Sequence, residues 1–265
     1  MRLKPDGLVT ATLPPKLKLA KKRLDLLVVE RGLADSRAKA QAMILAGEVR
    51  VNGERSDKAG AQISEDVRIE ISGGSAKYAS RGGFKLEGAL EDFAIDPRGR
   101  TCLDVGASTG GFTDCLLQHG AARVYAVDVT PQQMAWRLAQ DPRVTQIKAN
   151  ARNLRPEQIS EPVSLVTMDV SFIAVAKVLR AVVAAAGTGA EYLLLVKPQF
   201  ELDRGDIGSG GIVRDAALHE RAIERVREAA RLAGLSVAGV RPSHLAGAEG
   251  NQEFFLYARP ESKLP

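Results

Sequence analysis

The carboxyl-terminal two thirds of the chain alternates short apolar runs with stretches that repeat apolar residues at helical spacing. Strands are predicted at 101–105, 123–127, 144–149, 163–168 and 192–196, and helices at 112–119, 131–140, 174–186 and 216–233. Two last strands, at 236–242 and 253–259, follow one another with no helix between them. Repeated strand–helix units predict an α/β fold with a doubly wound, mostly parallel sheet, and we expect the directly connected last strand to be antiparallel.

The first third of the chain carries a different pattern. Short amphipathic helices are predicted at 24–31 and 37–46, and small strands around Val49 and at 67–71, with a hairpin turn signal at Asn52-Gly53. Residues 73–80 are small and polar, as linkers often are. We therefore expect a flexible basic extension at 1–20, a small α+β domain at 21–72, a linker at 73–80 and the α/β domain at 81–265.

Positive charge is concentrated in the front part of the chain. Residues 1–85 hold 17 Lys and Arg against 10 Asp and Glu, whereas the remaining residues hold 20 against 22. A basic module in front of a near-neutral α/β domain suggests a polyanionic partner, and ordinary solvated surface charge is the alternative. The basic side chains that we expect to meet phosphates are Arg23, Arg31, Arg37, Lys39, Arg50 and Lys58.

Several classes of protein are disfavoured by the composition. No run of eighteen apolar residues is present, because Arg180 and Glu191 interrupt the most apolar region, so we expect no membrane partner. The first twenty residues lack the continuous apolar stretch of a signal peptide. Cys102 and Cys115 lie in apolar patterns without the spacing of metal ligands, which suggests reduced core thiols and no metal. We therefore expect a cytoplasmic protein.

The stretch from Thr101 to Phe112 reads TCLDVGASTGGF and predicts a strand, a glycine turn and the start of a helix. Glycines let a ligand approach the backbone, and a helix start offers free N–H groups. The spacing D-x-G-x-x-x-G-G departs from the G-x-G-x-x-G of dinucleotide enzymes, which favours S-adenosylmethionine over NAD. A tight turn without a ligand is the alternative. The residues that we expect at the cofactor are Asp104, Gly106, Ser108, Thr109, Gly110, Gly111 and Phe112.

Further polar residues stand where predicted strands reach the ligand-binding edge of the sheet. Asp128 ends the second strand, where a carboxylate is able to hold both hydroxyls of a bound ribose. Asp169 and Lys197 each end a strand, Glu253 begins the antiparallel strand, and Lys85 lies on a helix ahead of the first strand. A surface salt bridge is the alternative for each residue alone. A lysine that closes the apolar run YLLLVK is costly to bury unless it is paired or neutral.

The resemblance to known families rests on longer motifs. The stretch RLDLLVVERGLADSRAKAQAMILAGEVRVNGE resembles the S4 RNA-binding domain. From about residue 21 to 260 the chain resembles the haemolysin-A-like (TlyA) family, which joins an S4 domain to a Rossmann-like methyltransferase of the FtsJ (RrmJ) group. The matching motifs are SRGGFKLEGAL, CLDVGASTGGFTDCLL, YAVDV, MDVSF, VKPQFE, GGIVRD and GNQEFFLYA.

The resemblance implies an enzyme that methylates the 2′-hydroxyl of cytidine in ribosomal RNA with S-adenosylmethionine. Its partners are then ribosomal RNA and ribosomal subunits, and its Lys-Asp-Lys-Glu tetrad falls on Lys85, Asp169, Lys197 and Glu253. The chain departs from FtsJ-like relatives at 149–152, which lacks an acidic residue, so Asn150 or the backbone is expected to meet the adenine.

Three other functions are weighed against this interpretation. An S4-type RNA-binding protein with an inactive methyltransferase domain is disfavoured by the intact tetrad. A pore-forming cytolysin is disfavoured by the lack of a membrane-inserting segment, and a small-molecule methyltransferase by the basic front module. Within the leading interpretation, Lys197 as a neutral amine would accept the hydroxyl proton. Lys85 and desolvation favour the neutral amine and the two carboxylates oppose it, so the balance is left open.

Overall fold

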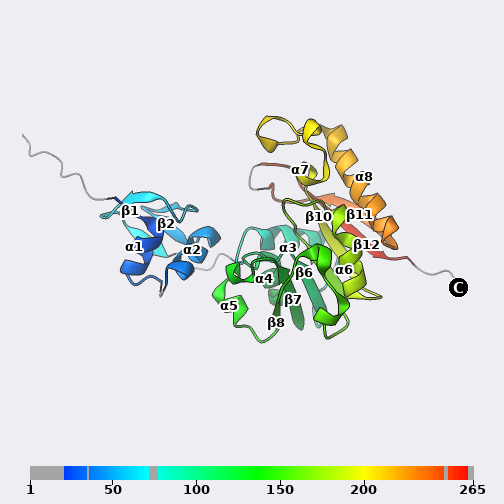
Figure 1. Ribbon diagram of the computed structural model, residues 1–265, viewed down its shortest axis with the longest axis horizontal. Coiled ribbons are helices and arrows are strands. Elements are labelled where there is room, and N and C mark those ends of the chain that lie inside the picture. The colour runs from blue at the N-terminus through cyan, green and yellow to red at the C-terminus, as the bar shows by residue number, and fades with distance from the viewer. Residues whose placement is uncertain (1–20, 35, 72–76, 248–249, 262–265) are drawn as a thin grey trace, which may run out of the picture.

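The computed structural model describes residues 21–34, 36–71, 77–247 and 250–261. Figure 1 shows two folded units, the front module with α1 and α2 and the larger α/β unit that begins with α3. The predicted extension at 1–20 and residues 73–76 of the predicted linker lie outside the described residues.

The α/β unit is built on a seven-stranded sheet. Its strands are β6 (Thr101–Val105), β7 (Arg123–Asp128), β8 (Val144–Lys148), β9 (Leu165–Met168), β10 (Glu191–Val196), β11 (Leu235–Pro242) and β12 (Phe254–Pro260). The strand order is β11-β12-β10-β9-β6-β7-β8. Strands β8, β7, β6, β9 and β10 pair in parallel, and β12 pairs antiparallel with both β10 and β11. The predicted mostly parallel sheet with an antiparallel last strand is confirmed.

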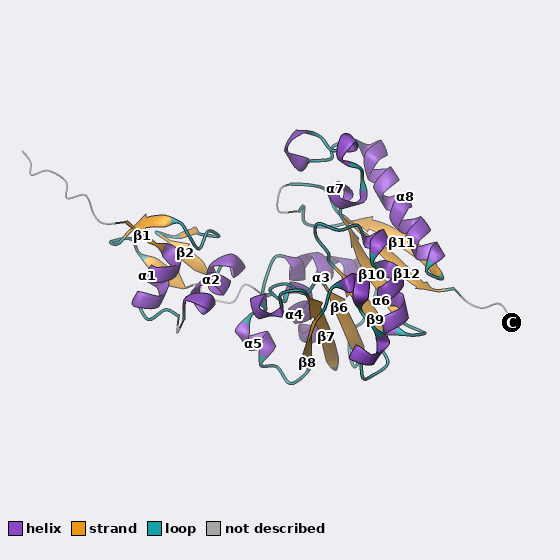
Figure 2. Ribbon diagram, viewed as in Figure 1, coloured by secondary structure: helices purple, strands orange, loops and turns teal. Residues whose placement is uncertain are grey.

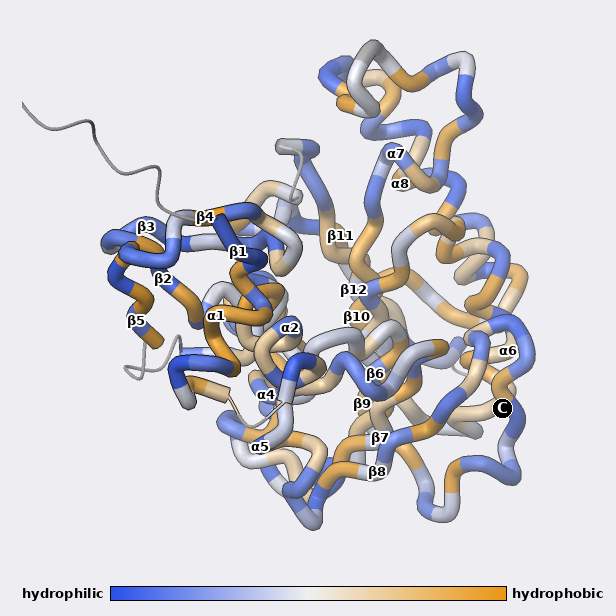
Figure 3. The backbone as a smooth tube through the Cα atoms, turned by 60° about the vertical axis from the view of Figure 1, so that its left-hand side comes forward, coloured by the Kyte–Doolittle hydropathy of each residue, from blue (hydrophilic) through white to orange (hydrophobic). Residues whose placement is uncertain are grey.

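Helices cover both faces of this sheet (Figure 2). The helices are α3 (Gly82–Asp92), α4 (Gly111–Gln118), α5 (Trp136–Ala139), α6 (Leu179–Ala186), α7 (Pro198–Glu201) and α8 (Ala216–Leu232). One core contains Leu86 of α3, Leu116 of α4 and Leu138 of α5, whereas the other contains Val182 of α6 and Val226 of α8. Two apolar layers on one sheet define the doubly wound arrangement. Figure 3 shows the hydrophobic segments of the chain in orange, several of them in the strands of this sheet.

Two cysteine thiols lie in this core, as expected. Cys102 and Cys115 are free and fully buried. Burial raises the pKa of both thiols to about 12, so both are protonated and unreactive at neutral pH.

Two predicted helices are each divided in two. The helix predicted at 174–186 becomes a 3₁₀ turn at Val175–Lys177 followed by α6. The pattern at 131–140 predicted a continuous helix, but the structure has a 3₁₀ turn at Pro131–Gln133 and then the short helix α5. Met134 and Ala135 between them have ψ of 136° and 131°. The Ala135 N–H donates to the Thr109 carbonyl at 3.1 Å. This bond to the glycine turn competes with the helical bond that the local pattern favours, and it draws the chain against the cofactor loop.

The front module contains two helices and two small sheets. Its elements are β1 (Lys21–Arg23), α1 (Leu24–Glu30), α2 (Arg37–Ala46), β2 (Val49–Val51), β3 (Glu54–Arg55), β4 (Gln62–Ser64) and β5 (Ile69–Ile71). A separate core forms around Leu24, Val28, Ala40, Ile44 and Val49. Strand β1 pairs with β4, although the sequence showed only a basic run there. The pattern missed it because a three-residue strand has no visible apolar alternation.

Residues 77–80, which we expected in the linker, pack against the α/β unit. Tyr78 is buried, and its hydroxyl donates to Glu87 at 2.9 Å. The Ala79 N–H donates to the Asp114 carboxylate of α4 at 2.6 Å, and Arg137 of α5 pairs with the same carboxylate. The chain is therefore held against α4 just before α3 begins.

A buried carboxylate organises the front module. Asp25 accepts hydrogen bonds from Arg23 at 2.8 and 2.9 Å, from Arg37 at 3.0 Å and from Gln41 at 2.7 Å. These bonds join the end of β1 and the start of α1 to α2. The hydrogen bonds from Arg23, aided by those from Gln41 and Arg37, hold the pKa of Asp25 well below its usual range despite burial.

We expect Asp25→Asn to destabilise the front module by about 1.5–3 kcal/mol, the range for hydrogen bonds to charged groups. Because the folded pKa is depressed, the wild-type contribution is fully present above the unfolded value of about 3.9 and is lost as the pH falls below it. Amide hydrogen exchange of α1 and α2 between pH 3 and 7 measures both effects. Equal protection in the two proteins at pH 7 would contradict this role.

Candidate active site at the carboxyl edge of the sheet

The glycine turn between β6 and α4 brings two strand ends together. Gly106 has a φ of +88°, and a Cβ there would lie 2.2 Å from the Asp169 carbonyl oxygen. Gly110 has a φ of +94°, and its Cβ would lie 2.4 Å from a methyl group of Leu138. Only glycine adopts this backbone conformation readily and also leaves room for a neighbouring atom where a Cβ would stand. The turn therefore holds the end of β9, and with it Asp169, directly against the predicted cofactor loop.

Asp128 at the end of β7 supports the same turn. Its Oδ2 accepts the Ser108 N–H at 2.8 Å, and its Oδ1 accepts the Thr130 N–H at 2.8 Å. Ser108 itself has a φ of +48°, which is uncommon for a residue other than glycine. The half-buried carboxylate thus holds a strained loop and also faces the hollow beside it.

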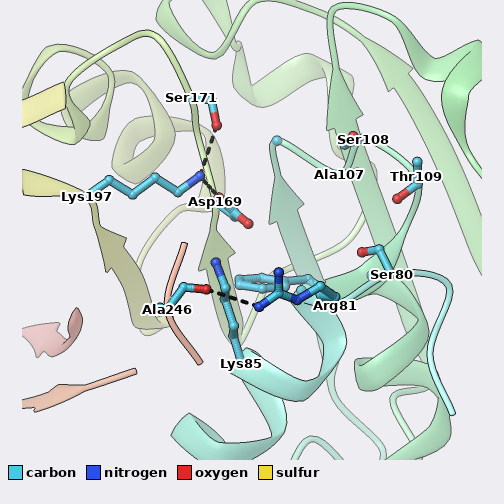
Figure 4. Close-up of a pocket in the computed structure, with 14 residues that line it drawn as sticks. Ser80, Arg81, Lys85, Ala107, Ser108, Thr109, Asp169, Ser171, Lys197 and Ala246 are labelled. Atoms are coloured by element: carbon cyan, nitrogen blue, oxygen red, sulfur yellow. Dashed lines mark hydrogen bonds and ion pairs between the residues drawn. The ribbon is translucent and has the colours of Figure 1, made fainter. Parts of the chain in front are cut away.

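Two neighbouring hollows meet at this turn. The first is lined by Ser80, Arg81, Gly82, Lys85, Gly106, Ala107, Ser108, Thr109, Gly111, Phe112, Asp169, Ser171, Lys197 and Ala246 (Figure 4). The second is lined on one side by Val105, Gly106, Ser108, Asp128, Val129, Asn150 and Arg152, and on the other by Asp169, Val170, Ser171 and Phe172. Seven of the nine predicted cofactor residues line one or both hollows; Asp104 and Gly110 do not.

Asp104 lies beneath the turn. It is fully buried in β6 and accepts hydrogen bonds from Thr113 at 2.7 Å and Thr167 at 3.2 Å. Burial raises its pKa to about 7, although both threonines oppose the shift. Asp104 therefore braces α4 and β9 behind the loop. Asn150 lies at the rim of the second hollow, and its side-chain oxygen accepts the Arg152 N–H at 3.0 Å.

The four predicted tetrad residues come together as two ion pairs. Lys85 of α3 donates to Glu253 at 2.5 Å, and Lys197 after β10 pairs with Asp169 after β9. Lys197 also donates to the Ser171 hydroxyl at 2.9 Å. In Figure 4 the two lysine side chains reach the same space from different elements, with Asp169 between them.

The tetrad side chains are largely buried, so each charge requires an oppositely charged partner. Lys85 and Lys197 are each 8% exposed and Glu253 is 2% exposed. A lysine at the end of an apolar strand would be costly to desolvate alone, so pairing with a carboxylate is the condition for its burial. The amino groups of Lys85 and Lys197 and the Asp169 carboxylate therefore line the first hollow.

Two aromatic rings beside this hollow were not singled out from the sequence. Phe172 is 93% exposed and has a φ of +64°, a strained conformation for a bulky residue. Its ring centroid lies 5.4 Å from that of Phe200, and the Lys197 ammonium lies 6.0 Å from the Phe200 centroid. The only sequence signal was that Phe172 closes the motif MDVSF and that Phe200 lies in the motif VKPQFE.

The loop before Glu253 is also braced by a residue that sequence reasoning missed. Asn251 is fully buried; its amide donates to the Gly211 carbonyl at 3.0 Å and accepts the Val213 N–H at 2.8 Å. A Cβ on Gly247 would lie 2.6 Å from the Glu253 carboxylate. The motif GNQE therefore ties the glycine-rich 208–211 region to the segment that positions Glu253.

The predicted phosphate-binding residues of the front module differ in their surroundings. Arg23 and Arg37 bind Asp25, and Arg31 donates to the carbonyls of Glu65 and Val67 at 2.6 Å. Arg50 donates to the Gly53 carbonyl at 2.9 Å. Lys58 is exposed and Lys39 is half-buried. Several of these cations therefore hold the module together as well as giving it positive charge.

Comparison with known proteins identifies the family. Residues 78–259 match the FtsJ-like methyltransferase family, and residues 22–69 match the S4 domain. The chain belongs to the FtsJ-like methyltransferase family. Its front module is an S4 domain, as the sequence predicted, and the α/β unit is the FtsJ-like domain.

Relatives match nearly the whole chain. It is 46% identical over 91% of its length to the 16S/23S rRNA (cytidine-2′-O)-methyltransferase TlyA of Mycobacterium tuberculosis, covering 90% of that protein. It is 40% identical over 89% of its length to Hemolysin A of Brachyspira hyodysenteriae, covering 98% of that protein. A solved structure described as a putative hemolysin from Streptococcus thermophilus has a TM-score of 0.70 and 40% identity, covering 93% of this chain and 92% of that one.

Because relatives carry the name hemolysin, the presence of membrane-spanning helices in this chain is a relevant question. Among the described residues, none of the helices has both the length and the apolar character needed to cross a membrane.

We expect Asp128→Ala to weaken S-adenosylmethionine binding by about 1.5–3 kcal/mol, the range for hydrogen bonds to a charged group. The variant loses a carboxylate that faces the second hollow and supports Ser108. Calorimetric titration measures the affinity. Asp96→Ala, which removes an exposed turn carboxylate ahead of β6, serves as the control. Equal affinities in both variants and the wild type would remove Asp128 from the cofactor site.

Proposed function

We propose that this protein transfers a methyl group from S-adenosylmethionine to a ribose 2′-hydroxyl in ribosomal RNA, that of a cytidine. The observation that carries the proposal is the pair of buried ion pairs, Lys85–Glu253 and Lys197–Asp169, beside the glycine turn of an FtsJ-like domain. The choice of cytidine and of ribosomal RNA is supported by the named activity of the M. tuberculosis relative.

The residues around the glycine turn fit the proposed cofactor. Gly106 lets the end of β9 approach the turn and lines both hollows, Asp128 offers a carboxylate to a ribose diol, and Val129 is an exposed apolar side chain beside it. Asn150 at the rim supplies a polar side chain and backbone for a base. When bound, S-adenosylmethionine supplies a methyl group on a positively charged sulfur. The protein's own contribution is to bind, orient and exclude water from the reacting groups.

Lys197 is the group that we place at the ribose hydroxyl. A hydroxyl must lose its proton during attack, and Lys197 is held at the edge of the first hollow by Asp169 and Ser171. Lys85 lies across the same space and is oriented by Glu253. Together the tetrad fixes two nitrogen groups near the hydroxyl, so that Lys197, as the neutral amine, receives the proton while Lys85, as an ammonium, stabilises developing negative charge.

Phe172 and Phe200 suit a nucleoside substrate. An exposed aromatic face beside the catalytic hollow offers a stacking surface for an unpaired base, the usual way in which proteins hold single-stranded RNA bases. The strained backbone of Phe172 indicates that its exposed position is imposed by the surrounding loop. The S4 domain adds positive charge for the phosphate backbone of the same RNA.

We expect Lys197→Ala to lower the methyl-transfer rate by about 10²–10⁴-fold, the typical effect of a lost general base. Affinities for the cofactor and for RNA should change little, because the ion pair, hydrogen bond and ring contact that Lys197 makes within the described part of the chain are with Asp169, Ser171 and Phe200. The measurement is transfer of a tritiated methyl group to purified ribosomal subunits, with mapping of 2′-O-methylated riboses. No incorporation with the wild type on either subunit would refute the proposed function.

Lys197→Arg is the sharper comparison, since arginine keeps the positive charge and cannot release its proton at neutral pH. We expect it to fail as Lys197→Ala does. Near-normal turnover of the arginine variant would assign Lys197 the role of a fixed charge and place the proton acceptor elsewhere.

Removal of residues 1–72 should leave an FtsJ-like domain that binds the cofactor normally but methylates RNA poorly. The two units have separate apolar cores, so the second is expected to fold alone. Phosphate contacts from the S4 domain should supply much of the RNA affinity, and this contribution falls as salt rises. Filter binding at 50 and 200 mM salt, with a matched transfer assay, measures it. Full activity of the truncated protein would exclude the S4 domain as the RNA anchor.

A further inference from the structure

Two chain segments form the catalytic side of the first hollow. The loop 169–175, which we call the aspartate loop, carries Asp169, Ser171 and Phe172. The segment 197–201, which we call the lysine segment, begins with Lys197 and ends with Glu201. They meet through the Lys197–Asp169 ion pair and the Phe172–Phe200 ring contact. The ion pair lines the first hollow, and Phe172 lines the second.

A third contact joins the same two segments from behind. The Val175 N–H donates to Oε1 of Glu201 at 2.7 Å. Glu201 ends α7, where its own N–H donates to the Lys197 carbonyl at 3.3 Å. The Glu201 side chain is therefore held one helical turn from Lys197 and reaches across to the far end of the aspartate loop.

Glu201 is an unusual carboxylate for this fold. It is 4% exposed, and its Oε2 is buried without a hydrogen-bond partner among the described residues. The nearest guanidinium, of Arg225 on α8, donates to the Glu201 backbone carbonyl at 2.6 Å instead of to the carboxylate. Among the described residues no cation pairs with the Glu201 carboxylate, and the Val175 N–H is a hydrogen-bond donor that holds it.

Burial raises the pKa of Glu201 to about 7, against the opposing effects of the Val175 and Ala176 N–H groups, Arg225 and Lys177. The other charged residues beside it line the adjoining groove and come from α8: Arg221, Glu224 and Glu228. Arg221 pairs with Asp206, and Glu228 pairs with Arg231, so these charges are engaged elsewhere.

We propose that Glu201 is a positioning residue for methyl transfer, which fixes the aspartate loop relative to Lys197 without touching a reacting atom. The proposal rests on the proposed function and adds to it a residue outside the tetrad. Displacement of the aspartate loop by about 1 Å would move Asp169, Ser171 and Phe172 together, and misplacement on this scale costs up to about 10²-fold in rate.

The test uses the full-length protein with three changes at this position. Glu201→Gln keeps an oxygen acceptor for Val175, Glu201→Leu removes it at similar volume, and Glu201→Asp keeps the acid but shortens its reach. Glu224→Leu is the matched control, since Glu224 is an exposed glutamate of the same groove whose ion-pair partner is Arg227 of its own helix. Each protein is measured for hydrogen exchange at 169–176, cofactor affinity and single-turnover transfer to ribosomal subunits.

We expect Glu201→Gln and Glu224→Leu to stay within about threefold of the wild-type rate. Glu201→Leu and Glu201→Asp should lose at least about tenfold in the maximal rate. Transfer rates are compared at saturating cofactor, because the aspartate loop lines the second hollow and its displacement should also weaken cofactor binding in the Leu and Asp variants. Protection of the Val175 amide should fall in the Leu and Asp variants alone, which locates the defect in the aspartate loop.

A second readout follows from the titration of Glu201. Its folded pKa lies above the unfolded value of about 4.3, so the folded protein holds the extra proton and loses stability as the pH rises from there through about 7. Glu201→Gln cannot ionise. The difference in melting temperature, variant minus wild type, should therefore become more positive as the pH rises from 5 to 8.

Wild-type rates in both Glu201→Leu and Glu201→Asp would overturn the proposal, as would unchanged protection of Val175 in them. A lower melting temperature with an unchanged rate would likewise reduce Glu201 to a stabilising role. If Glu201→Leu does not fold, the Gln and Asp variants decide the question. A wild-type protein without activity on ribosomal subunits would refute the proposed function instead, and the exchange measurement would still decide whether Glu201 holds the loop.

Discussion

The burial of two lysine ammonium groups at the edge of an apolar sheet is the constraint on which the site depends. Lys197 follows the buried strand β10, and Lys85 projects from α3; each reaches a carboxylate on a different element. An unpaired buried charge costs several kcal/mol even after relaxation. The four side chains are therefore stable only together, which requires α3, β9, β10 and the loop before β12 to meet at one point.

Buried carboxylates serve two different purposes in this protein, according to the groups around them. Asp25 is held ionised by Arg23 and its neighbours, and there the carboxylate binds β1, α1 and α2 into one module. Asp104 and Glu201 are buried without a bound cation, and desolvation raises the pKa of each to about 7. The first kind of carboxylate stabilises the fold through charge. The second kind offers acceptor atoms in fixed places behind the glycine turn and the aspartate loop.

Much of this architecture was predictable from local patterns. The strand–helix alternation indicated the doubly wound sheet, and the missing helix before the last strand indicated its antiparallel direction. The predicted element boundaries that were wrong are those where a tertiary hydrogen bond or packing contact competes with a local preference. Ala135 bonds to Thr109 and breaks the helix expected at 131–140, and Tyr78 leaves the polar linker to pack on α3 and α4.

The sequence by itself determined the two-domain order, the position of the glycine turn and the four polar residues at strand ends, because periodicity and spacing are local properties. Only the tertiary structure decided that Lys85 pairs with Glu253 and Lys197 with Asp169. It also decided that Asp104 lies beneath the glycine turn, that Glu201 bonds to the aspartate loop, and that Asn251 braces the segment before Glu253. Such choices depend on distances between residues far apart in the chain and on which charges the fold removes from water. The local sequence pattern encodes neither these distances nor the burial of these charges.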